Sequence, residues 1–274
     1  MTTAAALKPT RTRYAVLFFV FSAAFITYLD RVCMSVAAPA IQADLGLSQL
    51  QFGWIFTAFY VAYAVFEIPT AWLGDRWGQR VMLIRIVACW SLFTVFTGMA
   101  RSFAAMIATR SVFGAAEAGA FPTLSRALSR WFPVHERGRA NGIMWTGARS
   151  GGAFAPPIAV ALIGWLGWRN AFAIFGAVGL VWCAVCWRWY CDDPKDHASV
   201  NAAELELIRV GASPPPHAAE GVPWRKLLLN RTMLALFGSY FASGFGFQFF
   251  VTWLPTYFMR EHGLSLQKSG MFAA

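Results

Sequence analysis

The chain has 274 residues, of which 58% are hydrophobic and only 13% are charged, and its formal net charge is +10. A soluble domain carries about 25% charged residues, so this chain has too few charges to coat a water-soluble globule. A positive charge can indicate a nucleic-acid-binding protein, but the cations here cluster in short segments between long apolar runs. The composition therefore predicts an all-α membrane protein and argues against a nucleic-acid partner.

Seven apolar runs are long enough to cross a bilayer as helices, which takes about 20 residues each. In chain order they are Tyr14–Ile41, Phe52–Leu73, Val81–Ala100, Phe103–Ser125, Ala140–Leu166, Ala171–Tyr190 and Thr232–Phe258. We interpret the first run as an uncleaved span rather than a signal peptide, because its apolar character continues past Asp30 and Arg31. An eighth run begins near Ser265, shortly before the sequence given ends at Ala274.

The placement of Lys and Arg predicts the orientation of these spans. With the N-terminus in the cytoplasm, sixteen of these cations fall in inner segments and four in outer ones, as the positive-inside rule requires. One long polar segment then divides the chain into an N-terminal six-span bundle (residues 1–190), a cytoplasmic linker (residues 191–231) and the start of a C-terminal bundle (residues 232–274). Within the linker, Asn201 and Glu204 have the spacing of a capping box at the start of a short helix.

Six ionisable side chains fall inside the apolar runs, where a charge costs about 2.5–3.5 kcal/mol on insertion scales. They are Asp30, Arg31, Glu67, Arg110, Glu117 and Arg149. Such residues face one another, a watery cavity or a charged substrate, and this favours a transporter with a polar central cavity. The cysteines and histidines show no spacing typical of a metal or redox centre outside an apolar run, so we expect no metal, no cofactor and no enzymatic activity.

The segment between the second and third spans reads A-W-L-G-D-R-W-G-Q-R and is rich in glycine and charge. We expect Asp75 to cap the start of the third span, and Arg76 and Arg80 to hold the turn on the cytoplasmic side. The segment resembles the G-x-x-x-D-R-x-G-x-R loop signature of the major facilitator superfamily. Gly78 stands at the second glycine of that signature, while Ala71 replaces the first. The resemblance implies that this segment is a gating loop.

Other segments resemble the anion:cation symporter branch of that superfamily. They are residues 28–41 of the first span, 110–122 of the fourth, 131–140 of the following loop and 249–257 of the seventh. Members of this branch are similar in importing carboxylated compounds, such as hexuronates, aldonates and aldarates, together with protons. The resemblance implies a monomer of two six-helix bundles in the cell (inner) membrane, each bundle built from inverted three-helix repeats.

The charged residues of the first and fourth spans fit a carboxylate-binding, proton-coupled site. We expect Arg31 and Arg110 to bind a substrate carboxylate, and the resemblance implies that Asp30 and Glu117 carry protons. Arg110 and Glu117 lie seven residues apart on one helical stripe, so about 10 Å of helix separates them and disfavours a direct ion pair. A purely structural role for these two residues is the alternative.

Four further residues are candidates for the same site. Glu67 is either a third proton-coupling group or the partner of an arginine. Arg149 is either a second grip on a dianionic substrate or a partner of Glu67 or Glu117. Tyr63 and Gln248 are candidates to line the cavity with hydrogen-bonding groups, although residues of this kind more often pack or lie at the membrane interface.

The sequence thus predicts proton-coupled symport of an organic anion, such as a sugar acid, with the substrate, protons and the lipid bilayer as partners. An anion exchanger of the same fold is one alternative, since it needs the arginines but not Asp30 and Glu117. A twelve-span transporter needs about five more spans than this chain has. We therefore expect the chain to be truncated within its eighth span, and a fragment that reaches the membrane without transporting is the other alternative. A membrane enzyme or receptor would need a catalytic pair, a metal site or a large extramembrane domain, and none of these is recognisable in the sequence.

Overall fold

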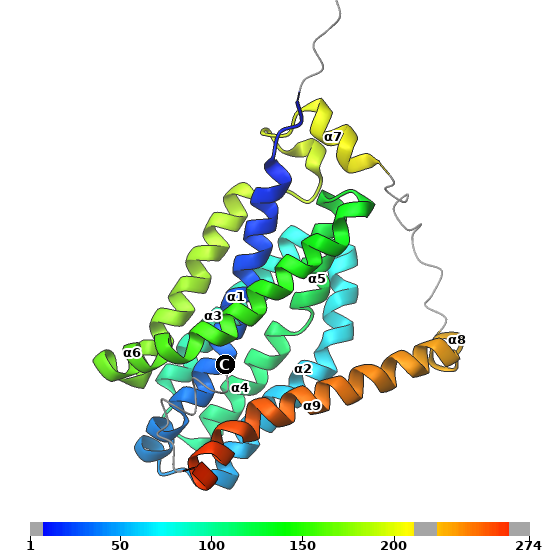
Figure 1. Ribbon diagram of the computed structural model, residues 1–274. Coiled ribbons are helices and arrows are strands. Elements are labelled where there is room, and N and C mark those ends of the chain that lie inside the picture. The colour runs from blue at the N-terminus through cyan, green and yellow to red at the C-terminus, as the bar shows by residue number, and fades with distance from the viewer. Residues whose placement is uncertain (1–7, 211–223, 263–274) are drawn as a thin grey trace, which may run out of the picture. The chain divides into compact units, whose positions relative to one another are not determined.

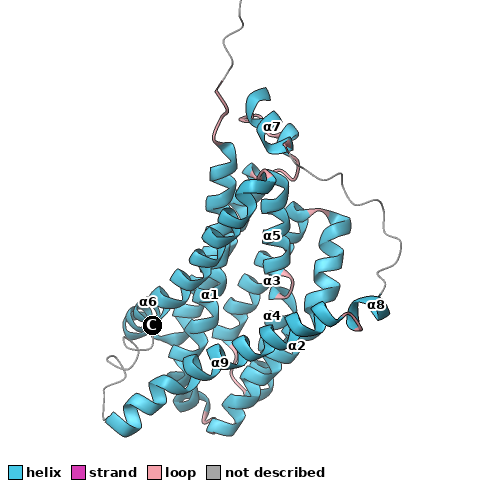
Figure 2. Cartoon of the chain, turned by 45° about the vertical axis from the view of Figure 1, so that its right-hand side comes forward, coloured by secondary structure: helices cyan, strands magenta, loops and turns pink. Residues whose placement is uncertain are grey.

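The computed structural model describes residues 8–210 and 224–262, and within these ranges every regular element is a helix (Figure 2). The predicted all-α class is therefore confirmed. The chain divides into two compact units, Met1–Ala212 and Ser213–Ala274. The second unit contains α8 (Trp224–Leu228) and α9 (Arg231–His262), and α9 covers the predicted seventh span. The predicted start of an eighth span lies outside the described residues.

The first unit contains the first six predicted spans. The helices α1 (Thr12–Leu45), α2 (Gln49–Trp77), α3 (Gln79–Met99) and α6 (Val134–Trp189) are long and apolar enough to cross a membrane. The long α6 consists of two helices joined at Gly167, whose backbone is not helical (φ 77°, ψ 160°), so it holds both the fifth and the sixth predicted spans.

The fourth predicted span is not one helix, and the expectation of an uninterrupted helix there is wrong. It consists of α4 (Phe103–Glu117) and α5 (Ala120–Trp131), joined by Ala118 (φ −54°, ψ 139°) and Gly119 (φ 78°, ψ 3°). These angles are those of a type II turn, whose third residue needs a positive φ and is therefore usually glycine. The turn ends α4 directly after Glu117.

The helices of the first unit pack mainly in three pairs: α1 with α6, α3 with α6, and α2 with α4. Figure 1 shows α1 running beside α6. Glycines allow these close approaches, as they do in membrane helix pairs generally. A Cβ atom on Gly147 of α6 would lie 2.6 Å from the backbone oxygen of Phe21 on α1.

The short helix α7 (Ala202–Arg209) is fixed to the start of α1 (Figure 1). Asn201 caps α7 as predicted, accepting the backbone N–H of Glu204 at 2.9 Å. The predicted return bond from Glu204 is not made, because its fully buried carboxylate instead accepts the backbone N–H groups of Thr12 and Arg13, each at 3.1 Å. The Arg13 guanidinium bridges that carboxylate and Glu136 of α6, at 3.2 Å each.

This cluster predicts that Glu204 anchors α7 to the bundle. Replacing Glu204 by Gln leaves the Arg13 charge without its buried partner, and breaking such a pair lowers the free energy of unfolding by about 3–5 kcal/mol. We expect a lower thermal unfolding midpoint and faster hydrogen exchange at the amides of residues 202–209. Glu206→Gln on the exposed face of the same helix is the matched control. Equal effects of the two substitutions would refute the anchoring role.

Candidate functional site

Four predicted site residues converge inside the first unit from two helices. Asp30 and Arg31 lie on α1, while Arg110 and Glu117 lie on α4, and we call these four residues the charged cluster. Asp30, Arg110 and Glu117 are 1%, 2% and 0% exposed. The cluster thus places two basic and two acidic side chains in the interior of the bundle, where an unpaired charge is costly.

The central contact of the charged cluster is an ion pair between α1 and α4. The Arg31 Nε donates a hydrogen bond to the Glu117 Oε1 at 2.9 Å, and the Glu117 side chain is fully buried. The Arg31 guanidinium also lies over the ring of Tyr63 on α2, 4.7 Å from its centroid. Aromatic faces attract cations by about 0.5–2 kcal/mol, most strongly where water is excluded. Arg31 is therefore held by a carboxylate on one helix and by a ring on another.

The second arginine of the cluster is held differently. The Arg110 guanidinium lies 4.2 Å from the centroid of Phe113 and 5.3 Å from that of Phe59. It interacts electrostatically with Asp30 and Glu117 but makes an ion pair within 4 Å with neither. Its Nη1 and both carboxylate oxygens of Asp30 are buried without a hydrogen-bond partner. The cluster is thus balanced in charge but retains unused hydrogen-bonding capacity.

The remaining predicted site residues lie at different distances from the charged cluster. Tyr63 touches the charged cluster, because its ring lies against the Arg31 guanidinium. Glu67, one turn further along α2, is half-buried and interacts electrostatically with Tyr63. Arg149 occupies an exposed position on α6, and Glu117, one of its two predicted partners, is paired with Arg31. The side chain of Gln248 lies outside the described part of α9.

The predicted gating loop joins α2 to α3 and also contacts α5. Asp75 lies in the last turn of α2 and pairs with Arg126 of α5 at 3.4 Å. It does not cap α3, so that expectation is wrong, because the N-cap position is Gly78, whose φ of 86° ends one helix and starts the next. The Arg76 guanidinium lies over the Trp72 ring at 3.9 Å.

The loop is also fixed to the segment after α6. The backbone N–H of Arg80 donates to the Asp192 Oδ1 at 2.7 Å, and the Arg80 guanidinium donates to the backbone oxygen of Trp187 and lies over its ring. A Cβ atom on Gly78 would collide with the Asp192 carboxylate. Gly78 and Arg80 therefore hold the loop to α6, while Asp75 holds it to α5.

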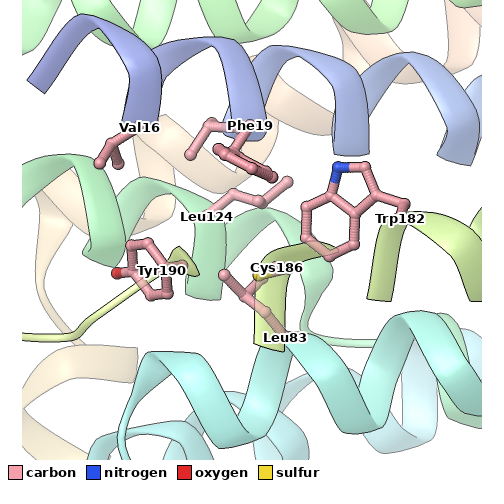
Figure 3. Close-up of a pocket in the computed structure, with 8 residues that line it drawn as sticks. Val16, Phe19, Leu83, Leu124, Trp182, Cys186 and Tyr190 are labelled. Atoms are coloured by element: carbon pink, nitrogen blue, oxygen red, sulfur yellow. The ribbon is translucent and has the colours of Figure 1, made fainter. Parts of the chain in front are cut away.

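A small internal cavity lies apart from the charged cluster. Figure 3 shows Val16, Phe19, Leu83 and Trp182 among the side chains around it. Its volume is about 10 Å³, and its lining is apolar. A cavity of that size barely holds one water, and a water needs polar partners, so this is a gap in packing rather than a ligand site. Within the described ranges, no group of three or more His, Cys, Asp and Glu is placed to hold a metal ion.

The sequence interpretation named Tyr63 but missed two phenylalanine rings that support the arginines, Phe59 and Phe113. Phe59 lies four residues before Tyr63 on α2, and Phe113 lies three residues after Arg110 on α4. Residues three or four apart share a helical face, so this spacing was the available signal. The contacts across helices, from Phe59 to Arg110 and from Tyr63 to Arg31, needed the structure.

Comparison with known proteins places these features in context. The family model described as Major Facilitator Superfamily matches residues 20–274. The "Probable sulfoacetate transporter SauU" of Cupriavidus necator is 38% identical, over 96% of this chain and 61% of that protein. The "D-galactonate transporter" of Escherichia coli O6:H1 is 33% identical, over 97% of this chain and 64% of that protein. The "Probable galactarate/D-glucarate transporter GarP" of Escherichia coli K12 is 34% identical over the same shares, 97% and 64%.

The chain therefore spans 61% to 64% of the length of these three relatives. Among solved structures, it matches a bacterial homologue of the human lysosomal transporter Spinster in an inward-facing, unoccupied conformation. That match has a TM-score of 0.69 and 23% identity, and it covers 96% of this chain and 59% of the other. At this identity the likeness supports the fold alone.

The turn at Gly119 gives a testable requirement for the position of Glu117. A Cβ atom on Gly119 would lie 2.7 Å from the Thr70 Cγ2 on α2. The positive φ of Gly119 also disfavours any other residue by about 1–2 kcal/mol. We expect Gly119→Ala to lower the thermal unfolding midpoint of the purified protein. Gly142→Ala is the matched control, since that helical position has no atom within 4 Å of a new Cβ, and there alanine favours the helix. A destabilising effect of Gly142→Ala as large as that of Gly119→Ala would contradict this account.

Proposed function

Because the chain belongs to the Major Facilitator Superfamily, we propose that it supplies the anion-binding and proton-binding groups of a symporter for small organic anions. It is a multi-pass membrane protein, and charged side chains inside membrane spans are costly and usually mark a functional site. The proposed substrates are carboxylates of the sugar-acid kind, taken up with protons across the cell membrane. The N-terminus is proposed to face the cytoplasm, with residues 1–190 as one bundle, residues 191–231 as linker and residues 232–274 as the start of a second bundle.

The observation that supports this proposal best is the pair of interior arginines with unused donors. The Arg31 Nη2 and the Arg110 Nη1 are buried and have no hydrogen-bond partner. A guanidinium offers several donors in a planar fork that matches a carboxylate, and charge-assisted bonds of this kind are the strong ones. The relatives named above are called transporters of sulfoacetate, galactonate, galactarate and glucarate, and each of these anions carries at least one carboxylate.

The Arg31–Glu117 ion pair suggests how anion and proton binding are coupled. A substrate carboxylate that binds Arg31 competes with Glu117 for the same guanidinium. Glu117 is fully buried, and a buried carboxylate that loses its counter-ion is far more stable in its protonated form. Substrate binding therefore favours proton uptake at Glu117, and proton uptake there frees Arg31 for the substrate. Asp30 and Arg110 provide a second acid and base in the same interior.

The other predicted residues have subsidiary roles in this proposal. Tyr63 orients Arg31, and Glu67 is a further titrating group on α2. Arg149 provides a second contact for a dianionic substrate, and Gln248 stays a candidate hydrogen-bonding residue. The gating loop contains Asp75, Arg76, Gly78 and Arg80. In this proposal its contacts stabilise one arrangement of the helices and break in another.

Two conservative substitutions test the anion site. Arg31→Lys and Arg110→Lys keep the positive charge but remove the planar fork. We expect each to weaken the binding of D-galactonate, D-glucarate or sulfoacetate by about 10- to 100-fold, since a hydrogen bond to a charged group contributes about 1.5–3 kcal/mol. Binding is measured by calorimetry on the purified protein in lipid, with Arg188→Lys on the exposed end of α6 as the control. Unchanged affinity in both interior variants would exclude this assignment.

Neutral carboxamides test the proton-coupling groups. Asp30→Asn and Glu117→Gln mimic the protonated acids, so we expect proton-driven accumulation of labelled substrate in vesicles to be lost. Exchange of labelled for unlabelled substrate should survive in at least one variant, because it needs no net proton movement. Asp196→Asn, at an exposed position, is the control.

Uphill accumulation in both variants would favour an anion exchanger over a symporter. The same assay on vesicles that contain only the 274-residue chain tests the alternative of a non-transporting fragment. Saturable, proton-stimulated uptake in those vesicles would rule that alternative out.

A further inference from the structure

We propose that Trp90 is a positioning residue for Asp30: its indole N–H binds the charged carboxylate and sets the pH at which that carboxylate exchanges its proton. Trp90 lies on α3 and is 1% exposed, and Asp30 lies on α1 and is equally buried. This inference rests on the proposed proton coupling and adds a residue, and a third helix, that the charged cluster did not include.

The first argument is a mismatch of donors and acceptors at one place in the interior. The Trp90 Nε1 and both Asp30 oxygens are buried without a hydrogen bond of ordinary geometry, yet the two side chains are close enough to interact. Nearly all buried polar atoms in proteins have a partner, and the exceptions call for an explanation. A small rotation of either side chain would join this donor to this acceptor.

The second argument is a contrast with the other buried tryptophans among the described residues. The Trp131 Nε1 donates to the backbone oxygen of Cys191 at 3.0 Å, and the Trp182 Nε1 donates to the Ser22 Oγ at 2.9 Å. The Trp168 Nε1 donates to Asp44 at 3.3 Å. A buried indole normally finds such a partner, and only Trp90 of these four has none. The Asp30 carboxylate, with which this indole interacts, also lacks a partner.

The third argument is the enclosure of the Trp90 N–H by α6. A Cβ atom on Gly179 would lie 3.6 Å from the Trp90 Nε1 and 3.1 Å from the Ser91 Cβ. The glycine thus lets α6 pack closely against Ser91, and a Cβ there would meet the indole nitrogen at ordinary contact distance. The Trp90 N–H is therefore buried where α3 and α6 meet, away from water.

The groups that face Asp30 have opposing effects on its charge. Arg110 of α4 favours the charged carboxylate, whereas Glu117 of α4, which carries a like charge, opposes it. The Cys33 thiol of α1 also faces Asp30. An indole N–H is a donor only and does not titrate in this range, so it favours the charged form at every pH. Protonation of Asp30 weakens this bond, so proton uptake loosens the contact between α1 and α3.

The test is the titration of Asp30 in Trp90→Phe, which keeps an aromatic ring but removes the N–H. The measurement is infrared difference spectroscopy of the carboxyl band on the full chain in lipid bilayers, with the Asp30 band identified by its loss in Asp30→Asn. We expect the midpoint of Asp30 protonation to move to higher pH by about one to two units, the equivalent of one hydrogen bond to a charged group. No substrate is needed, so a protein that failed to transport would still give this result.

Trp182→Phe is the matched control, because it removes a buried indole whose N–H is already bonded to Ser22. It should lower thermal stability without moving the midpoint. An unmoved midpoint in Trp90→Phe, or an equal shift in Trp182→Phe, would overturn the proposal.

If Trp90→Phe fails to fold, the indole N–H resonance of Trp90 in the unmodified chain provides the second measurement. It should follow the Asp30 titration by NMR and lose that dependence in Asp30→Asn. A resonance that is independent of pH in the unmodified chain would equally overturn the proposal.

Discussion

The ion pair between Arg31 and Glu117 is the interaction on which the interior of the first unit depends. It joins α1 to α4 at 2.9 Å, with the carboxylate fully buried, and removing one partner of such a pair leaves an uncompensated charge. The rings of Tyr63 and Phe59 then position the two arginines from α2. Three helices therefore meet around one charge pair, and its strength depends on the exclusion of water. Any ligand that competes for Arg31 changes the electrostatics of all three.

Much of the helical framework could be predicted from the sequence, because hydropathy alone marks a span of about 20 apolar residues. The break in the fourth span was missed, although a signal was present. Gly119 is followed three residues later by Pro122, and proline is tolerated in the first turn of a helix, where its missing N–H is not needed. The start of α5 lies within an apolar run, and hydropathy alone does not distinguish a turn from a continuous helix there.

The four residues of the charged cluster could be chosen from the sequence, but which of them form an ion pair could not. Arg110 and Glu117 share a helix, and their spacing argued against a bond between them, yet nothing in the chain indicated that Glu117 binds Arg31 instead. In the same way, the capping-box spacing of Asn201 and Glu204 predicted a hydrogen bond from the Asn201 N–H to the Glu204 side chain. The Glu204 carboxylate instead accepts the N–H groups of Thr12 and Arg13, which are distant in sequence. Local patterns report which groups are available, and only tertiary packing decides which partner is bound.

The turn at Ala118 and Gly119 has a mechanical consequence. On one side of it, Glu117 ties α4 to α1, and on the other, Arg126 ties α5 to Asp75 of α2. A continuous helix would transmit any rotation at one of these ties to the other. The turn interrupts the helix between these two ties, so a rotation at one of them is not carried to the other by a continuous hydrogen-bonded backbone. The change of direction in this span is thereby confined to two residues, and α4 and α5 each keep their own helical hydrogen bonds.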